Sequence, residues 1–80
     1  MQMIEEFELV ALLIDLPKVK LIRGDVGTVV MIHGEQKGFE VEFVNASGRT
    51  IAVETLYPDQ IKKVDQSTAV LHVPELQLAV

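Results

Sequence analysis

The side chains that could support chemistry in this chain are two histidines, two serines and one pair of closely spaced glutamates. His33 and His72 fall in different segments, and a metal ion would need a further ligand, such as a carboxylate, beside them. Ser47 and Ser67 have no histidine at a spacing that indicates a nucleophile and its base. We therefore predict no metal site, no cofactor and no catalytic residue, and we expect that the protein is not an enzyme.

The glutamate pair lies in the most regular part of the sequence. Glu40 and Glu42 alternate with Phe39, Val41 and Phe43, and this period of two is typical of a strand with one buried face and one wet face. Strand geometry places the two carboxylates on one face about 7 Å apart, where a pair could do acid–base work inside a pocket. The outer face of a small barrel rarely offers a pocket, so we interpret the pair as a solvated face.

Composition limits the remaining classes of function. The 80 residues are 49% hydrophobic and include no cysteine, which excludes disulfides and thiolate metal sites. The net charge of −5 is opposite in sign to that of a typical nucleic-acid binder. The N-terminal ten residues are acidic where a secretory signal would be basic, and no apolar run reaches the roughly 20 residues of a membrane span. We expect one cytoplasmic domain with no membrane association.

Alternating hydrophobicity and turn residues predict five short strands. The apolar run over residues 9–14 fits a buried strand or the middle of a helix by periodicity, but Pro17 follows too soon for a helix. Gly48 is expected to close the turn over 45–48 with positive φ, with Asn45 as the alternative. The predicted strands cover 9–14, 24–33, 39–43, 49–54 and 61–64, with a basic loop over 15–23 and one helical turn over 56–60.

The predicted core combines the inward sides of these strands. Val41 and Phe43 are expected to face inward together with Ile51 and Val53 of the next strand. The apolar faces on both sides of the strand over 24–33 predict a bend or bulge near Gly27. The other residues expected to contact this core are Val10, Leu12 and Val29 in the strands, Val19, Leu21 and Ile22 in the loop, and Phe7 in the N-terminal lead.

Together these elements predict an all-β fold, a small SH3-like five-stranded barrel over residues 1–65 with an extra C-terminal strand. Such barrels suit short chains because partial closure hides strand edges. Residues 66–80 form an apolar C-terminal extension that alternates on both sides of Pro74. We predict that this extension is one strand, or two short strands kinked at the proline.

Three motifs resemble a family of small, uncharacterised bacterial proteins that is common in cyanobacteria. They are Gly24-Asp25-Val26-Gly27-Thr28-Val29-Val30, Phe39-Glu40-Val41-Glu42-Phe43 and Leu56-Tyr57-Pro58-Asp59-Gln60-Ile61, and the resemblance runs from about Phe7 to Val64. Members are often encoded beside toxin-like or other small genes, which implies an antitoxin-like or accessory binding role. The first motif is also similar, less specifically, to the KOW motif of ribosomal and transcription proteins.

The residues left for function are those that could recognise a surface. Lys18, Lys20 and Arg23 lie in the long loop and Tyr57 precedes the helical turn. The basic cluster is either a solvated loop or a contact for an anion or a partner. We predict a non-catalytic protein-interaction module; the alternative is a KOW-like module that binds nucleic acid or the ribosome, which the acidic charge disfavours. The lack of clustered aromatic residues argues against recognition of proline-rich ligands.

The C-terminal extension supplies the second predicted binding surface. Exposed termini are usually polar, whereas this segment is apolar and would form a patch of the kind that marks an interaction site. We predict that it pairs with a partner protein or with a second copy by strand addition; the alternative is that it folds back on its own barrel. The residues expected to make this contact are Val70, Leu71, Val73, Leu76 and Leu78.

Overall fold

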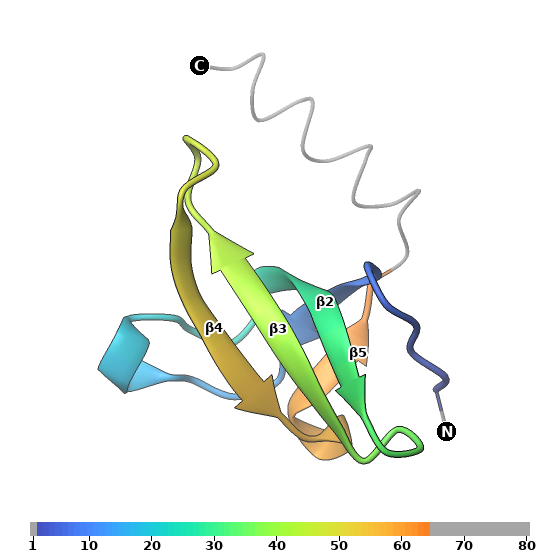
Figure 1. The fold of residues 1–80 in the computed structure, drawn as a ribbon. Coiled ribbons are helices and arrows are strands. Elements are labelled where there is room, and N and C mark those ends of the chain that lie inside the picture. Colours follow the sequence, from blue (N-terminus) through green and yellow to red (C-terminus); the bar gives the residue numbers. More distant parts are fainter. Residues whose placement is uncertain (1, 65–80) are drawn as a thin grey trace.

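The computed structural model describes residues 2–64, which form a single antiparallel sheet of five strands (Figure 1). The strand order is β4-β3-β2-β1-β5, so β4 and β5 are the two edges and the sheet is not closed between them. The arrangement confirms the all-β prediction and follows the order of an SH3-like barrel. The elements are β1 (Leu9–Leu12), β2 (Val26–His33), β3 (Gly38–Val44), β4 (Thr50–Leu56) and β5 (Ile61–Lys63), with 3-10 turns η1 (Pro17–Val19) and η2 (Pro58–Gln60).

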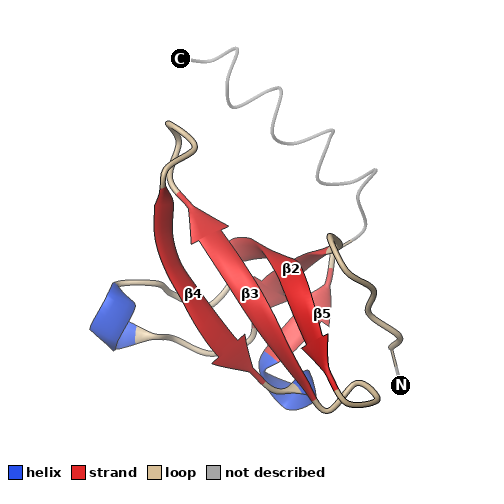
Figure 2. Ribbon diagram, viewed as in Figure 1, coloured by secondary structure: helices blue, strands red, loops and turns tan. Residues whose placement is uncertain are grey.

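The sheet curls around one hydrophobic core. Figure 2 shows β4, β3 and β2 as a twisted front layer, with β5 passing behind them. The core is entirely aliphatic and aromatic, and its members come from every strand, from the long loop and from the N-terminal segment. It consists of Ile4, Val10, Leu12, Leu21, Val29, Phe39, Val41, Phe43, Leu56 and Ile61.

A close backbone approach explains how β2 bends. A Cβ atom at Gly27 would lie 2.6 Å from Cγ1 of Val41 and 2.8 Å from Cε1 of Phe43, so only glycine fits beneath β3. The register of β2 against β3 then shifts between Val29 and Met31. Such a bulge bends the strand and increases its twist. The predicted bend is therefore confirmed, with the irregularity two residues beyond the glycine.

The orientation of β4 corrects one prediction about the core. Val41 and Phe43 are buried as expected, but Ile51 and Val53 are 48% and 51% exposed. The reason is the cross-strand register, which places Ala52 opposite Phe43 and Glu54 opposite Val41. Residues directly opposite one another share a face of the sheet. Ala52 and Glu54 therefore take the core side of β4, and the two larger aliphatic residues point away from the core.

The N-terminal segment corrects a second prediction. Phe7 was expected beneath the domain, yet it is 71% exposed, whereas Ile4 is 1% exposed and belongs to the core. Phe7 has φ of 70° and donates its N–H to the Val29 carbonyl at 2.6 Å. This turn directs the Phe7 side chain outward, and the segment crosses the barrel so that Ile4 fills its end.

In the long loop between β1 and β2, one of the three residues predicted to contact the core does not do so. Leu21 is buried and Val19 packs against the core as expected, but Ile22 is exposed. Ile22 begins a turn in which its N–H donates to the Asp25 carboxylate at 2.9 Å and its carbonyl accepts from the Asp25 N–H. The turn leaves no core position for the isoleucine side chain.

The predicted boundary at residue 65 and the predicted strand in 66–80 lie outside the described residues. In the part that the structure describes, no helix has the length and apolar character needed to cross a membrane.

The orientation of β4 predicts contrasting effects for two truncations. Phe43→Ala should lower the free energy of unfolding by about 3–5 kcal/mol because it empties a buried aromatic site. Val53→Ala should cost less than about 1 kcal/mol because the side chain is already half in water. Urea denaturation of both variants measures the difference, and equal losses would mean that β4 faces the other way.

The turn between β3 and β4 predicts a strain effect at Gly48. Gly48 has φ of +83° with open space around it, and the Asn45 side chain accepts from the Ser47 and Arg49 N–H groups. Asn45 has no positive φ, so glycine is the left-handed residue as expected. Gly48→Val should destabilise by about 1–3 kcal/mol, and Gly48→Asn by clearly less. Thermal unfolding compares them; an unshifted valine variant would contradict the turn geometry.

Candidate functional site

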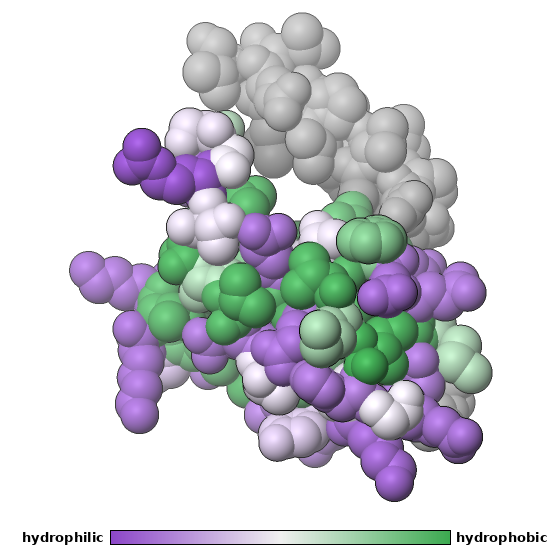
Figure 3. All heavy atoms as spheres, viewed as in Figure 1, coloured by the Kyte–Doolittle hydropathy of each residue, from purple (hydrophilic) through white to green (hydrophobic). Residues whose placement is uncertain are grey.

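The side of β2, β3 and β4 that points away from the core, here called the outer face, is unusually apolar. Figure 3, viewed from this side, shows apolar side chains extending across it between polar ones. Thr28 of β2 lies opposite Glu42 of β3. In the same antiparallel register, continued by two residues on each strand, Val26 lies opposite Val44. An apolar band thus crosses the outer face, and its large exposed members are Val26, Met31, Val44, Ile51 and Val53.

Two threonines of β4 tie the outer-face glutamates to this band. The Thr50 hydroxyl donates to Oε2 of Glu42 at 2.6 Å, and the Thr55 hydroxyl donates to Oε2 of Glu40 at 2.7 Å. His33 lies on the other side of Glu40, with Nε2 2.7 Å from the same oxygen. The Thr55 hydrogen bond, followed by the one from His33, holds the pKa of Glu40 below its ordinary value.

This arrangement does not resemble an acid–base pair. A general acid needs a carboxyl group whose pKa is raised toward neutrality, whereas the pKa of Glu40 is lowered. Each glutamate accepts a hydrogen bond from its own threonine, and the bonds run across β3 and β4. The pair therefore acts as a cross-strand tether that fixes how β4 lies on β3.

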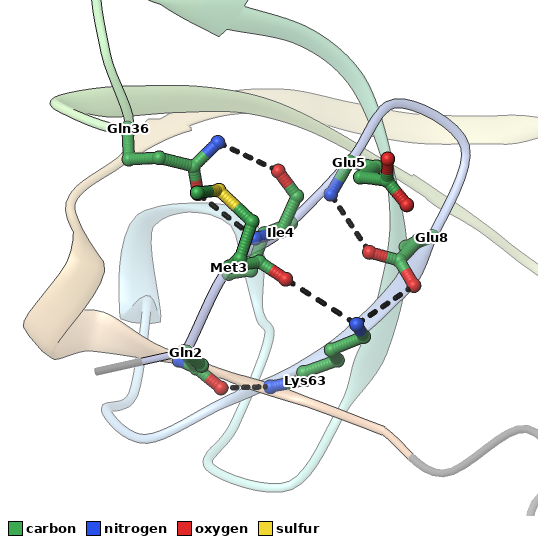
Figure 4. A network of polar contacts seen from close by, with 7 residues as sticks. All are labelled: Gln2, Met3, Ile4, Glu5, Glu8, Gln36 and Lys63. Atoms are coloured by element: carbon green, nitrogen blue, oxygen red, sulfur yellow. Dashed lines mark hydrogen bonds and ion pairs between the residues drawn. The ribbon is translucent and has the colours of Figure 1, made fainter.

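The two edges of the sheet are treated differently. At β5, the Gln2 side chain donates to the Ile61 carbonyl at 3.0 Å. It also accepts from the Lys63 N–H at 2.8 Å (Figure 4). A side-chain amide thus occupies the place of a neighbouring strand. At the opposite edge, β4 pairs with β3 on one side and with no other strand of residues 2–64.

The exposed edge of β4 lacks three of the usual protections, although a register shift between Phe43 and Val44 interrupts its pairing with β3. Natural edges are blunted by lysine, by proline or by very short strands. β4 is seven residues long, and its sequence, Thr50-Ile51-Ala52-Val53-Glu54-Thr55-Leu56, contains neither lysine nor proline. A long β-branched edge of this kind is a template for an added strand.

The basic and aromatic residues predicted from the sequence are exposed but are not joined into one site. Lys18, Lys20 and Arg23 lie on the loop around η1, and Tyr57 lies at the start of η2. Asp15 shares the loop and accepts the Arg23 N–H at 2.8 Å. No hydrogen bond or ion pair in the described part of the chain links the basic side chains to Tyr57. The predicted residues Val70, Leu71, Val73, Leu76 and Leu78 lie outside it.

Sequence reasoning missed the open edge of β4 and the exposed positions of Ile51 and Val53. Alternation identifies the two sides of a strand but not which side is buried, and the larger residues were assigned inward. The one available signal was Leu56, which is buried and shares its face with Ala52 and Glu54.

Five short antiparallel strands, a long first loop and a 3-10 turn before the last strand define a small SH3-like fold, in which no other element of residues 2–64 pairs with the edge of β4. The chain belongs to the family described as Domain of unknown function (DUF4926), whose model matches residues 6–63 and so includes all five strands. The predicted membership of an uncharacterised family is thereby confirmed. No curated protein and no solved structure matches the chain.

The tether predicts how Glu40 titrates. Thr55→Val removes the main hydrogen bond to the carboxylate, so the pKa of Glu40 should rise toward its ordinary value near 4.5. A lowered pKa in the folded state stabilises the fold above the unfolded-state value, and this contribution disappears as the pH falls through the folded-state pKa. The variant should therefore be less stable than the parent at neutral pH, and part of that difference should vanish in strong acid.

Carboxyl ¹³C titration by NMR and urea denaturation at the two pH values measure both effects. Thr50→Val is the matched control because its hydroxyl contacts Glu42 instead. A Glu40 titration that moves equally in both variants would contradict the assignment.

Proposed function

We propose that this chain is a non-catalytic protein-interaction module, an antitoxin-like or accessory partner of a neighbouring gene product in a bacterial cytoplasm. The observation that carries the proposal is the edge of β4, which no strand of residues 2–64 covers, beside the exposed Ile51 and Val53. A strand added to a free edge gains main-chain hydrogen bonds, and its alternate side chains provide specificity. The resemblance to small proteins encoded beside toxin-like genes is consistent with such a role.

The energetics favour a contact at this edge. Val53 and Ile51 keep about half of their surface in water. Removing that remainder from water stabilises a complex by roughly 1 kcal/mol for each side chain. The free N–H and C=O groups of β4 restrict how a partner can bind, because a strand can form hydrogen bonds with them in only a few registers.

The partner is either another protein or a second copy of this chain. The apolar residues Val70, Leu71, Val73, Leu76 and Leu78 support self-association through the C-terminal segment, which the sequence predicts. In both cases, a segment of a protein chain binds at the β4 edge, and neither case requires a catalytic site.

Nucleic acid fits the outer face poorly. β2, β3 and β4 contain three glutamates and no lysine or arginine. Phosphate binding depends on lysine and arginine. The KOW-like alternative rests on the motif Gly24-Asp25-Val26-Gly27-Thr28-Val29 and on Lys18, Lys20 and Arg23. The segment between β1 and β2 that holds these basic residues also carries Asp15 and Asp25.

The proposal predicts that a charge at the edge abolishes binding. The full chain is co-expressed with the products of the genes adjacent to its own, and the mass of each purified species is measured by light scattering. Val53→Lys should lose the complex, because a lysine on an edge strand opposes strand addition. Met3→Lys is the control, since Met3 is also exposed but lies on the N-terminal segment.

A complex that survives Val53→Lys unchanged would contradict the proposed surface. A chain that remains a monomer at high concentration and binds none of the neighbouring products would contradict the proposed function.

A further inference from the structure

We infer that the segment accepted by β4 is an extended strand with apolar residues on one face and a lysine or arginine on the other, opposite Glu54. The inference rests on the proposed function and specifies the chemistry of the partner. It follows from how the two sides of β4 differ.

Glu54 occupies a position that normally belongs to an apolar residue. Its cross-strand neighbour Val41 is fully buried, so the Glu54 side chain leaves β4 on the core side of the sheet. The residue is half-buried at the open edge. In contrast to Glu40 and Glu42, it makes no hydrogen bond or ion pair with any residue between 2 and 64.

A carboxylate in this position acts as a filter on added strands. An incoming strand would cover Glu54 and remove water from it, which is costly unless a partner group compensates. Inward-pointing charges on edge strands are one way in which proteins prevent non-specific pairing. A cation directly opposite the carboxylate removes the penalty, because opposite charges in a cross-strand pair attract. Specificity then comes from rejecting apolar and acidic strands.

The opposite side of β4 requires different side chains. Ile51 and Val53 lie on the outer face, so the adjacent positions of an added strand would bury apolar groups against them. The partner must therefore alternate between apolar and basic residues. A positive charge on the partner meets no lysine or arginine on the neighbouring strands, because all seven of these residues lie outside β2, β3 and β4.

The C-terminal segment of this chain meets only half of that requirement. Residues 66–80 contain many apolar residues but no lysine or arginine, and His72 is the one side chain that can become cationic. At neutral pH an unperturbed histidine is mostly uncharged. A segment from another protein, with a permanent cation, therefore fits the edge better than this chain's own terminus.

Two short peptides test the inference on the full chain. The probes are the capped peptides Thr-Val-Lys-Val-Lys-Val-Thr and Thr-Val-Glu-Val-Glu-Val-Thr, and binding is followed by ¹⁵N NMR shifts and amide exchange. The lysine peptide should shift and protect β4 amides, and the glutamate peptide should bind at least about tenfold more weakly, because like charges would face each other. Glu54→Gln should remove most of this preference, whereas Glu35→Gln, in the exposed turn after β2, should keep it.

The outcomes separate the inference from the proposed function. Equal binding of both peptides at β4 would overturn the partner chemistry and leave the edge as the interaction site. Absence of any change at β4 with either peptide would overturn the edge as the docking site. Protection in the free chain of the β4 amides that point away from β3 would also overturn the inference. Light scattering would then tell whether a second copy or the chain's own terminus covers them.

Discussion

The pairing of β4 with β3 is the constraint on which the core and the outer face both depend. Ala52 lies opposite Phe43 and Glu54 lies opposite Val41. A slip of one residue would bury Ile51 and Val53 but would move Leu56 out of the core, because side chains alternate strictly between faces. Buried Leu56 and the hydroxyl bonds from Thr50 and Thr55 oppose that slip. The cost is an outer face that leaves two β-branched side chains half in water.

The N-terminal segment completes the barrel from the other side. The Gln36 side chain donates to the Ile4 carbonyl at 2.7 Å and accepts from the Ile4 N–H at 2.8 Å. Together with the Gln2 contacts to β5, this gives two places where a glutamine amide replaces a strand neighbour (Figure 4). The segment buries Ile4 and covers the β5 edge at once, and β4 remains as the uncovered edge of the described sheet.

The sequence predicts most of this fold because its strongest patterns are local. Phe39 and Phe43 share a face and leave little doubt about which side of β3 is buried, and Gly48 has the chemistry that its turn requires. The orientation of β4 depends on contacts with β3 that no local pattern contains. The coverage of β5 depends on Gln2, which is 59 residues away from Ile61 in the chain. Ile4 and Phe7 exchange roles because of one backbone turn with positive φ, which hydropathy does not predict.

One of the three departures from local pattern lies on β4, where Ile51 and Val53 are exposed although the sequence predicts them in the core. Natural sequences agree with their folds at most levels and depart from agreement mainly at functional sites. An SH3-like fold does not by itself imply a function, so a function has to be inferred from the residues of β4. Two copies of β4 placed edge to edge would desolvate a Glu54 carboxylate on each strand, and neither strand carries a cation to compensate. The same glutamate that would favour a basic partner strand thus opposes the pairing of this edge with itself.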